Sequence, residues 1–315
     1  MPPPAFANRG LREISQRRNI IGRLALQLHA AGVNRIFLLA ILLFGIANAA
    51  PLAIRAVAAN LTSDSKQSYS PDNGNHSNPE GAGARILKAL KPDIVMIQEF
   101  NTSIAVRQWI NGTLGENYFF MREEGMQIPN GIISRFPIVA SGSWDDPELT
   151  NREFAWAQLR LPDKNDLWVV SVHLHSKGGT SREKEAAALA NFIAEKIPKD
   201  ALILIGGDFN TRSRDELCFK QLARVVTIPE KPPTDQLGEI STNAPRNRPY
   251  DWVLASPPLN QAAVPVKLAD AEFPHGLVFD SRVFEPLGKV PPVQKTDSGV
   301  PNMQHMAVVR DFIIP

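Results

Sequence analysis

Short apolar or alternating segments recur along most of the chain, and polar turns rich in glycine and proline separate them. Alternation with a period of two indicates a strand with one buried face, whereas a short continuous apolar run indicates a strand buried on both faces. The run at residues 201–205, Ala-Leu-Ile-Leu-Ile, is of the second kind. These patterns predict strands at residues 53–59, 94–98, 131–134, 154–161, 167–174, 201–205, 250–255 and 306–313.

Helical periodicity is confined to a few segments, at residues 82–90, 103–110, 183–197 and 215–225. Strands mixed with helices favour an α/β fold of two packed sheets with helices outside, rather than a barrel or a helical bundle. Residues 226–249 and 256–301 are rich in Pro, Asn and Ser, so long loops over the sheet edges are expected there. Because no linker divides the chain after residue 51, residues 51–315 are predicted to form one domain.

Residues 1–49 differ from the rest of the chain. A basic segment precedes an apolar run at residues 36–46, and Ala47-Asn48-Ala49 follows. This order predicts a secretory signal peptide that is cleaved near Ala49, so the mature protein is expected to be periplasmic or secreted. The apolar run is shorter than the roughly 20 residues that a membrane-spanning helix needs. An uncleaved membrane anchor at residues 36–47 is therefore the less favoured alternative.

Removal of this segment changes the charge of the protein. It carries six of the 34 basic residues and one of the 32 acidic residues, so the formal net charge falls from +2 to −3. A slightly acidic protein gets no general electrostatic help in binding a long polyanion, although a local basic groove remains compatible with it. Cys218 is the only cysteine, which excludes an intrachain disulfide, and we expect it to be a small buried hydrophobic residue.

The strongest local motif, Gly206-Gly207-Asp208-Phe209-Asn210, follows the apolar run at residues 201–205. The glycines are expected to let the backbone turn sharply and to place Asp208 beside Asn210 at a strand end. A carboxylate two residues from an amide suits a hard metal ion and a phosphoryl oxygen. An Asx-type turn is the structural alternative, and the motif alone does not decide between the two.

Other polar side chains stand at the ends of predicted strands. Glu99 follows residues 94–98, where a charge is costly unless it joins a salt bridge or binds a metal. Asn60 ends the first strand and by itself indicates a turn. Strand alternation places His173 and His175 on one face, which would allow a zinc site. No third His or Cys lies nearby in the sequence, and the carboxylate and amide groups favour Mg²⁺ or Mn²⁺.

In their order, these motifs resemble those of the endonuclease/exonuclease/phosphatase superfamily. The motifs are Ala59-Asn60, Ile97-Gln98-Glu99, Ser134-Arg135-Phe136-Pro137-Ile138, Val172-His173-Leu174, Gly207-Asp208-Phe209-Asn210, Tyr250-Asp251-Trp252 and His305-Met306-Ala307-Val308. Each motif is weak alone, but the whole series in the family's order is hard to obtain by chance. The resemblance covers residues 54–312 and implies a four-layer sandwich of two packed mixed sheets flanked by helices.

The resemblance also implies a metal-dependent phosphoric ester hydrolase. Asn60 and Glu99 would hold the divalent metal, Mg²⁺ or Mn²⁺. Asp208 and Asn210 would orient the attacking water and a phosphoryl oxygen.

In the same terms, His173 would bind the phosphate, Asp251 would support the histidines, and His305 would be the second histidine at the phosphorus. Lys177 and Arg135 are expected to bind the substrate, although a solvated loop position is the commoner fate of a lysine such as Lys177.

The expected reaction is in-line attack by water on a phosphodiester, as in a nuclease or another phosphodiesterase. One alternative is a phosphomonoesterase that acts on a small phosphorylated metabolite or a lipid headgroup. Another is a non-catalytic phosphate-binding relative. The expected partner is a phosphoester substrate, either nucleic acid, phospholipid or phosphorylated metabolite. We expect a monomer with no obligate protein partner.

The last motif departs from the family pattern. The family usually has Ser-Asp-His, whereas this chain has Met303-Gln304-His305. Gln304 brings no charge, so we expect His305 to lack a strong carboxylate partner unless Asp297 folds back to supply one. The pKa of His305 is then expected near its free value of about 6.5.

Overall fold

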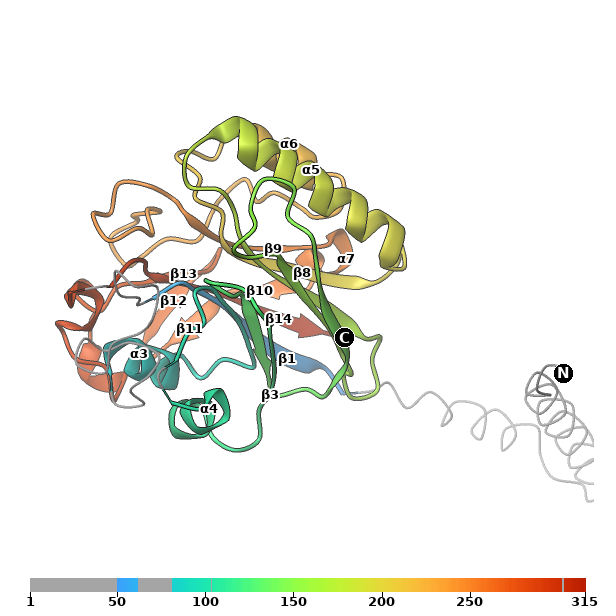
Figure 1. Cartoon of the computed structure of the whole chain (residues 1–315). Coiled ribbons are helices and arrows are strands. Elements are labelled where there is room, and N and C mark those ends of the chain that lie inside the picture. Colours follow the sequence, from blue (N-terminus) through green and yellow to red (C-terminus); the bar gives the residue numbers. More distant parts are fainter. Residues whose placement is uncertain (1–49, 62–80, 103, 302) are drawn as a thin grey trace, which may run out of the picture. The chain divides into compact units, whose positions relative to one another are not determined.

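The computed structural model describes residues 50–61, 81–102, 104–301 and 303–315 (Figure 1). Residues 1–49, which contain the predicted signal peptide and its cleavage site, lie outside the described residues, as does Ser103 at the start of one predicted helix. Among the described residues, no helix has both the length and the hydrophobicity that a membrane span requires.

The first sheet has the strand order β10-β14-β1-β2-β4-β3, and β13 also pairs with β14. β1 and β2 are parallel, and α3 (Ala82–Leu90) lies between them in the sequence. The other pairs in this sheet are antiparallel. The strands are β1 (Leu52–Ala59), β2 (Ile94–Ile97), β3 (Phe119–Arg122), β4 (Gly131–Ser134), β10 (Ala263–Val264), β13 (Leu277–Phe279) and β14 (Ala307–Ile314).

The second sheet has the order β5-β6-β7-β8-β9. β7 and β8 are parallel and α5 (Gly179–Lys196) connects them, while the other pairs are antiparallel. Its strands are β5 (Ile138–Trp144), β6 (Phe154–Leu159), β7 (Leu167–His173), β8 (Leu202–Asp208) and β9 (Asp251–Ala255). The remaining elements are α4 (Val106–Thr113), α6 (Leu217–Leu222), α7 (Pro257–Gln261), the hairpin of β11 (Val266–Leu268) and β12 (Ala271–Phe273), and 3-10 turns at Leu287–Lys289 and Asp297–Gly299.

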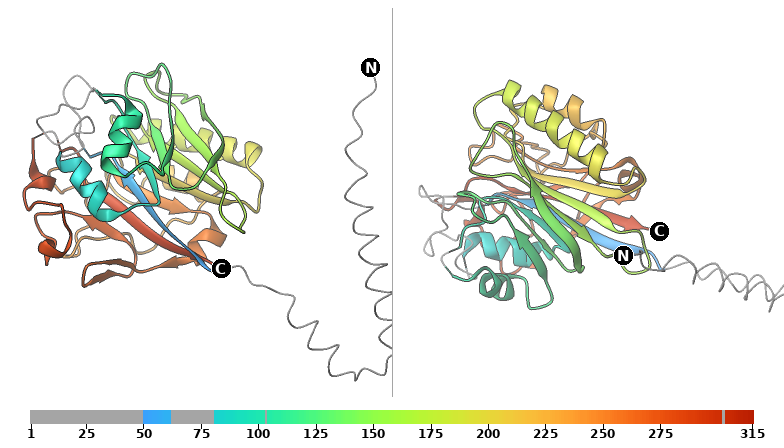
Figure 2. Two further views of the ribbon diagram at one scale, coloured as in Figure 1. Left: turned by 90° about the horizontal axis from the view of Figure 1, so that it is seen from below. Right: turned by 45° about the vertical axis from the view of Figure 1, so that its right-hand side comes forward.

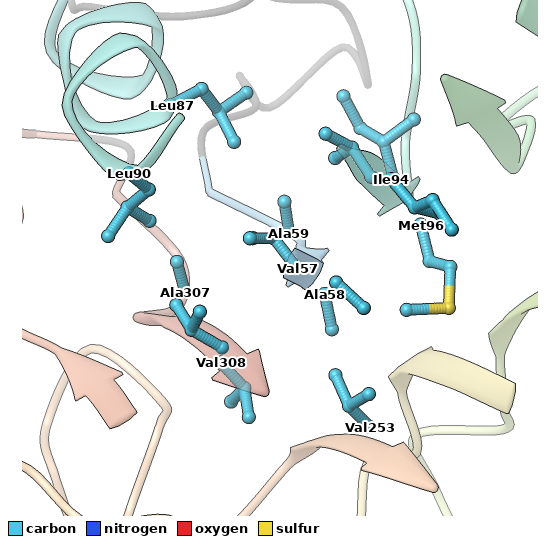
Figure 3. Close-up of a cluster of buried hydrophobic side chains, with 14 of the residues drawn as sticks. Val57, Ala58, Ala59, Leu87, Leu90, Ile94, Met96, Val253, Ala307 and Val308 are labelled. Atoms are coloured by element: carbon cyan, nitrogen blue, oxygen red, sulfur yellow. The ribbon is translucent and has the colours of Figure 1, made fainter. Parts of the chain in front are cut away.

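The two sheets pack face to face, with α3 and α4 outside the first and α5 and α6 outside the second (Figures 1 and 2). Side chains of β1 alternate between the layers, so that Leu87 and Leu90 of α3 lie on one side of the strand and Val253 of β9 on the other (Figure 3). Both faces of the sheet are therefore buried. This arrangement confirms the predicted α/β sandwich of two mixed sheets flanked by helices.

The expectation of loops throughout residues 256–301 is wrong. This segment contains α7 and four strands, β10 to β13. Each of these strands has only two or three residues, which is too few to show a period of two. β10 and β13 are held by pairing with β14, a segment distant in the sequence. Residues 226–249 contain no helix or strand, as predicted.

Gly206 and Gly207 do not form the predicted turn, because β8 continues through both of them to Asp208. A Cβ atom at Gly206 would lie 2.5 Å from Met96 Cε of the other sheet. A Cβ at Gly207 would lie 2.1 Å from the carbonyl oxygen of Val172, and the φ of Gly207 is +141°. The glycines therefore allow close approach of neighbouring backbone and of the opposite sheet.

Gly207→Ala is expected to destabilise the protein by at least about 2 kcal/mol, because it combines a positive φ with a backbone clash. Urea unfolding measures the change. Gly238→Ala is the matched control, since Gly238 also has a positive φ (+87°) but a Cβ atom added there would meet no atom within 4 Å. If Gly207→Ala loses no more stability than Gly238→Ala, then the close approach of the neighbouring backbone does not require glycine at residue 207.

Candidate active site

Six polar residues meet at one edge of the sandwich, where strand ends from both sheets come together. The carboxyl ends of β1, β2, β7 and β8 lie there with the amino ends of β9 and β14. The pairing register aligns His173 with Asp208 and Asp208 with Asp251 on adjacent strands. All six residues are buried: Asn60, Glu99, His173, Asp208, Asp251 and His305.

Asp208 lies at the centre of this group. Its Oδ2 is 3.2 Å from His173 Nε2, accepts a hydrogen bond from Asn60 Nδ2 at 3.2 Å, and lies 3.8 Å from His305 Nδ1. Its Oδ1 accepts a hydrogen bond from the Asn210 N–H at 2.8 Å. Burial raises the pKa of Asp208 to about 7, although the charge of His305 opposes the shift. This carboxylate therefore titrates in the range suited to a general base.

His305 and Asp251 form an ion pair across the two sheets. His305 Nδ1 lies 3.0 Å from the Asp251 carboxylate, and Thr242 Oγ1 donates a hydrogen bond to Asp251 Oδ2 at 2.6 Å. Burial alone lowers the pKa of His305, but the charges of Asp251 and then Asp208 outweigh it and raise that pKa to about 9. His305 is consequently protonated at neutral pH.

The expectation that His305 lacks a carboxylate partner is therefore wrong. Asp251 supplies the charge, and Asp297 instead pairs with Arg85, whose Nε lies 3.0 Å away. Gln304 Nε2 donates to Asn60 Oδ1 at 3.5 Å. Because neighbouring side chains along extended backbone point in opposite directions, the residue before His305 is poorly placed to support its ring.

His173 differs electrostatically from His305. Burial, together with the charges of Arg152 and His305, lowers the pKa of His173 well below its ordinary value, so the ring is neutral. His173 Nε2 faces Asp208, while Nδ1 is buried and has no hydrogen-bond partner among the described residues. Such an unpaired buried atom is costly unless a ligand or water engages it.

Glu99 and Asn210 both occupy the left-handed region, with φ values of 50° and 52°. The Asn210 N–H bond to Asp208 is an Asx-type turn, and Asn210 Nδ2 donates to the Leu174 carbonyl at 2.9 Å. The turn and the polar cluster therefore coexist at this motif. Within the described part of the chain, no residue makes a hydrogen bond or ion pair with the Glu99 carboxylate, which is 8% exposed.

The structure does not bring Arg135 to this edge. Arg135 follows β4 at the end that pairs with Ile94, whereas Glu99 follows the other end of β2. It forms an ion pair with Asp93, with Nη1 2.7 Å from Oδ1. Arg135 is therefore not brought together with the other predicted site residues, because β4 runs antiparallel to β2. Lys177 is exposed on the loop after β7, four residues beyond His173.

Arg152 is a buried site residue that the sequence patterns did not indicate. Its Nε donates to the carbonyl of His173, and its Nη2 donates to that of Leu174 at 3.1 Å. It thereby holds the backbone that carries His173. Arg152 lies just before a predicted strand, without a motif around it. Only the tertiary fold places it beneath the site.

The donor set fits a hard divalent cation. The carboxylates of Asp208 and Asp251 offer oxygen ligands that lie within 4.8 Å of each other and of a His305 ring nitrogen, which binds a metal only when it is deprotonated. Glu99 and Asn60 add further oxygen donors, which suits Mg²⁺ or Mn²⁺ better than zinc. His175 does not complete a zinc site with His173. β7 ends at His173, and His175 Nδ1 accepts the backbone N–H of Lys177 at 2.9 Å.

Comparison with known proteins agrees with this geometry. Residues 73–271 match the model of the Endonuclease/Exonuclease/phosphatase family. The chain belongs to this family, and it is accordingly a phosphoesterase by class.

Two kinds of relative are similar to the chain. A sphingomyelinase of Mycobacterium bovis is 35% identical over 78 residues, which are 24% of this chain and only 16% of the length of that relative. An endonuclease/exonuclease/phosphatase from Beutenbergia cavernae has a TM-score of 0.56 at 15% identity, over 83% of this chain and 72% of that one. SmcL has a TM-score of 0.53 at 16% identity, over 82% and 99%. The two structural similarities support the fold.

Asp251→Asn is expected to lower the pKa of His305 from about 9 towards the free value of about 6.5, because the largest positive contribution to that pKa is removed. Histidine NMR titration measures it directly. The ion pair of His305 and Asp251 should stabilise the folded protein fully below pH about 6.5. This stabilisation should be lost as the pH rises to about 9, where His305 loses its proton. An unchanged His305 titration in Asp251→Asn would show that this ion pair does not set the pKa.

Proposed function

We propose that this protein is a divalent-metal-dependent phosphodiesterase that cleaves its substrate by in-line attack of water on phosphorus. The observation that carries the proposal is the buried group of Asp208, Asp251, His173 and His305. It combines a carboxylate that titrates near neutrality with a histidine held protonated. The reaction requires a base that accepts a proton from the attacking water. It also requires positive charge near the phosphoryl oxygens.

Glu99 and Asn60 would hold Mg²⁺ or Mn²⁺. The Glu99 carboxylate supports this assignment because it is buried and unpaired among the described residues, and Asn60 Oδ1 accepts only a long hydrogen bond, from Gln304 at 3.5 Å, within the same part of the chain. When bound, the metal stabilises negative charge on the phosphoryl and leaving oxygens.

The chain's own groups then have distinct tasks. Asp208 accepts the proton of the attacking water. The backbone N–H of Asn210 orients the Asp208 carboxylate through its hydrogen bond to Oδ1. The His305 imidazolium stabilises the charge that develops on the phosphoryl oxygens, while Asp251 fixes its orientation and protonation. Neutral His173 donates its Nε2–H to the ionised Asp208 carboxylate, 3.2 Å away, and so holds the base in place. Lys177 extends the positive charge on the loop beyond β7.

Two observations bear on the substrate. Sphingomyelin, which the mycobacterial relatives are named for, is a phosphodiester, although the match covers only a small part of those proteins. The formal charge of −3 without residues 1–49 gives no general attraction to a long nucleic acid. A phospholipid headgroup ester is therefore favoured over a polynucleotide. Residues 1–49 have basic, apolar and small-residue segments in the order of a signal peptide. They would direct export of the protein to the compartment where it meets that substrate.

A catalytically inactive relative is less well supported. The departure at Gln304 is the main feature in favour of it. His305 has a carboxylate partner in Asp251, so the substitution at residue 304 does not remove the charge from the site.

Chelator should abolish activity, and Mg²⁺ or Mn²⁺ should restore it. Glu99→Gln should weaken Mn²⁺ binding, measured by calorimetry, by at least about 10-fold, since a ligand charge is lost. Glu195→Gln is the matched control because Glu195 is exposed on α5. Binding that is insensitive to Glu99→Gln but lost in Asp251→Asn would move the metal to the group of Asp208, Asp251 and His305.

The enzyme should prefer bis(p-nitrophenyl) phosphate over p-nitrophenyl phosphate by at least about 10-fold in kcat/KM. Asp208→Asn should lower turnover of the diester by about 10²-fold or more, as expected for a positioned base. Parallel assays with choline phospholipids and DNA identify the substrate class. A preference for the monoester would instead assign a phosphomonoesterase.

A further inference from the structure

The described part of the chain contains three buried arginines, and they differ in what neutralises them. Arg182 binds Glu216 through two hydrogen bonds, at 2.7 and 2.9 Å. Arg152 lies in the field of four carboxylates, including Asp208. Arg310 is 7% exposed and has no carboxylate partner among the described residues. A guanidinium keeps its charge in proteins, so this one is buried without a counterion.

The Arg310 side chain is held in place by groups that carry no negative charge. Nη1 donates to the Val253 carbonyl at 3.2 Å, and Nη2 donates to Asn260 Oδ1 at 2.9 Å. The guanidinium also lies over the Phe312 ring, 5.1 Å from its centroid. A guanidinium has five N–H donors, so these two hydrogen bonds leave donors for a ligand.

Arg310 lines a cavity of about 610 Å³ on the flank of the sandwich. The wall contains Asn260 of α7, β10 and the turn at residues 274–276, and these elements can be followed from the labels in Figure 1. Exposed His275 and Lys231 add basic groups at the same cavity, and Glu230 is the one acidic residue among the described residues that line it. The volume is within the range of small-molecule sites.

We propose that this cavity binds a small organic anion whose carboxylate or phosphate is received by the Arg310 guanidinium. The fork of N–H groups matches the paired oxygens of either anion. The apolar wall, which includes Ile228 and Val264, accommodates the organic part of the ligand. The anion supplies the counterion that none of the described residues provides.

This site is separate from the reaction centre. Arg310 is five residues beyond His305, a distance of roughly 16 Å along extended backbone. Its guanidinium contacts β9 at Val253, beyond Asp251 at the strand's beginning. Neither the metal ligands nor the catalytic groups of the reaction centre line the cavity. The inference therefore does not rest on the proposed reaction.

Crystals soaked with selenate or with 4-bromobenzoate test the proposal, because anomalous scattering locates each anion. Selenate represents tetrahedral oxyanions such as phosphate, and 4-bromobenzoate represents carboxylates. For at least one of the two, the anomalous peak should place the anion so that its oxygens lie within about 4 Å of the Arg310 guanidinium. In solution the same probe should bind with a Kd of about 1 mM or tighter, followed by NMR at the Gly276 amide.

Arg310→Met should weaken binding of that probe by at least about 10-fold, whereas Arg224→Met, at an exposed arginine just after α6, should leave it unchanged. If Arg310→Met does not fold, Asn260→Ala tests the same guanidinium, since it removes one of the two hydrogen bonds that position it. No anion at Arg310 in the wild type would overturn the proposal. Equal affinity in the wild type and in the folded variant would also overturn it.

Discussion

A buried ion pair between the two sheets is the interaction on which the site depends. His305 stands at the start of β14 in the first sheet, and Asp251 begins β9 in the second. Asn60 and Asp208 make a second polar contact across the same edge. Removing one partner of a buried ion pair costs about 3–5 kcal/mol, because the other charge is left without compensation. The site and the packing of the sheets are therefore linked.

The link between the site and the packing requires the two sheets to approach each other closely. Gly206 and Gly207 leave room for Met96 of the first sheet and for the Val172 carbonyl of the neighbouring strand. The same strand ends in Asp208, so any separation here would move the central carboxylate from its partners. Burial and the neighbouring charges together then shift the pKa values of the titratable groups in different directions. The pKa of Asp208 rises to about 7, that of His305 rises to about 9, and that of His173 falls.

Charge is compensated differently at the two buried sites. In the reaction centre, carboxylates and a histidine balance one another within the protein, and Arg152 adds positive charge beneath them. At Arg310, only a carbonyl, an amide oxygen and an aromatic ring contact the guanidinium within the described part of the chain. The first environment suits a cation and a phosphate together. The second suits an anion alone, which is why we infer separate ligands for the two.

The sequence by itself determined most of the longer strands, the helices α3 to α6, the family and the residues that gather at the strand ends. Local periodicity sets elements such as residues 82–90 and 131–134, and motif order carries the family. The resemblance implied that Asp251 supports the histidines, but only the tertiary structure decided its direct pairing with His305, the place of Arg135 and the strands β3, β5 and β10 to β13. These depend on which distant segments become neighbours. Asp251 and His305 are 54 residues apart, and no local pattern encodes the 3.0 Å between them.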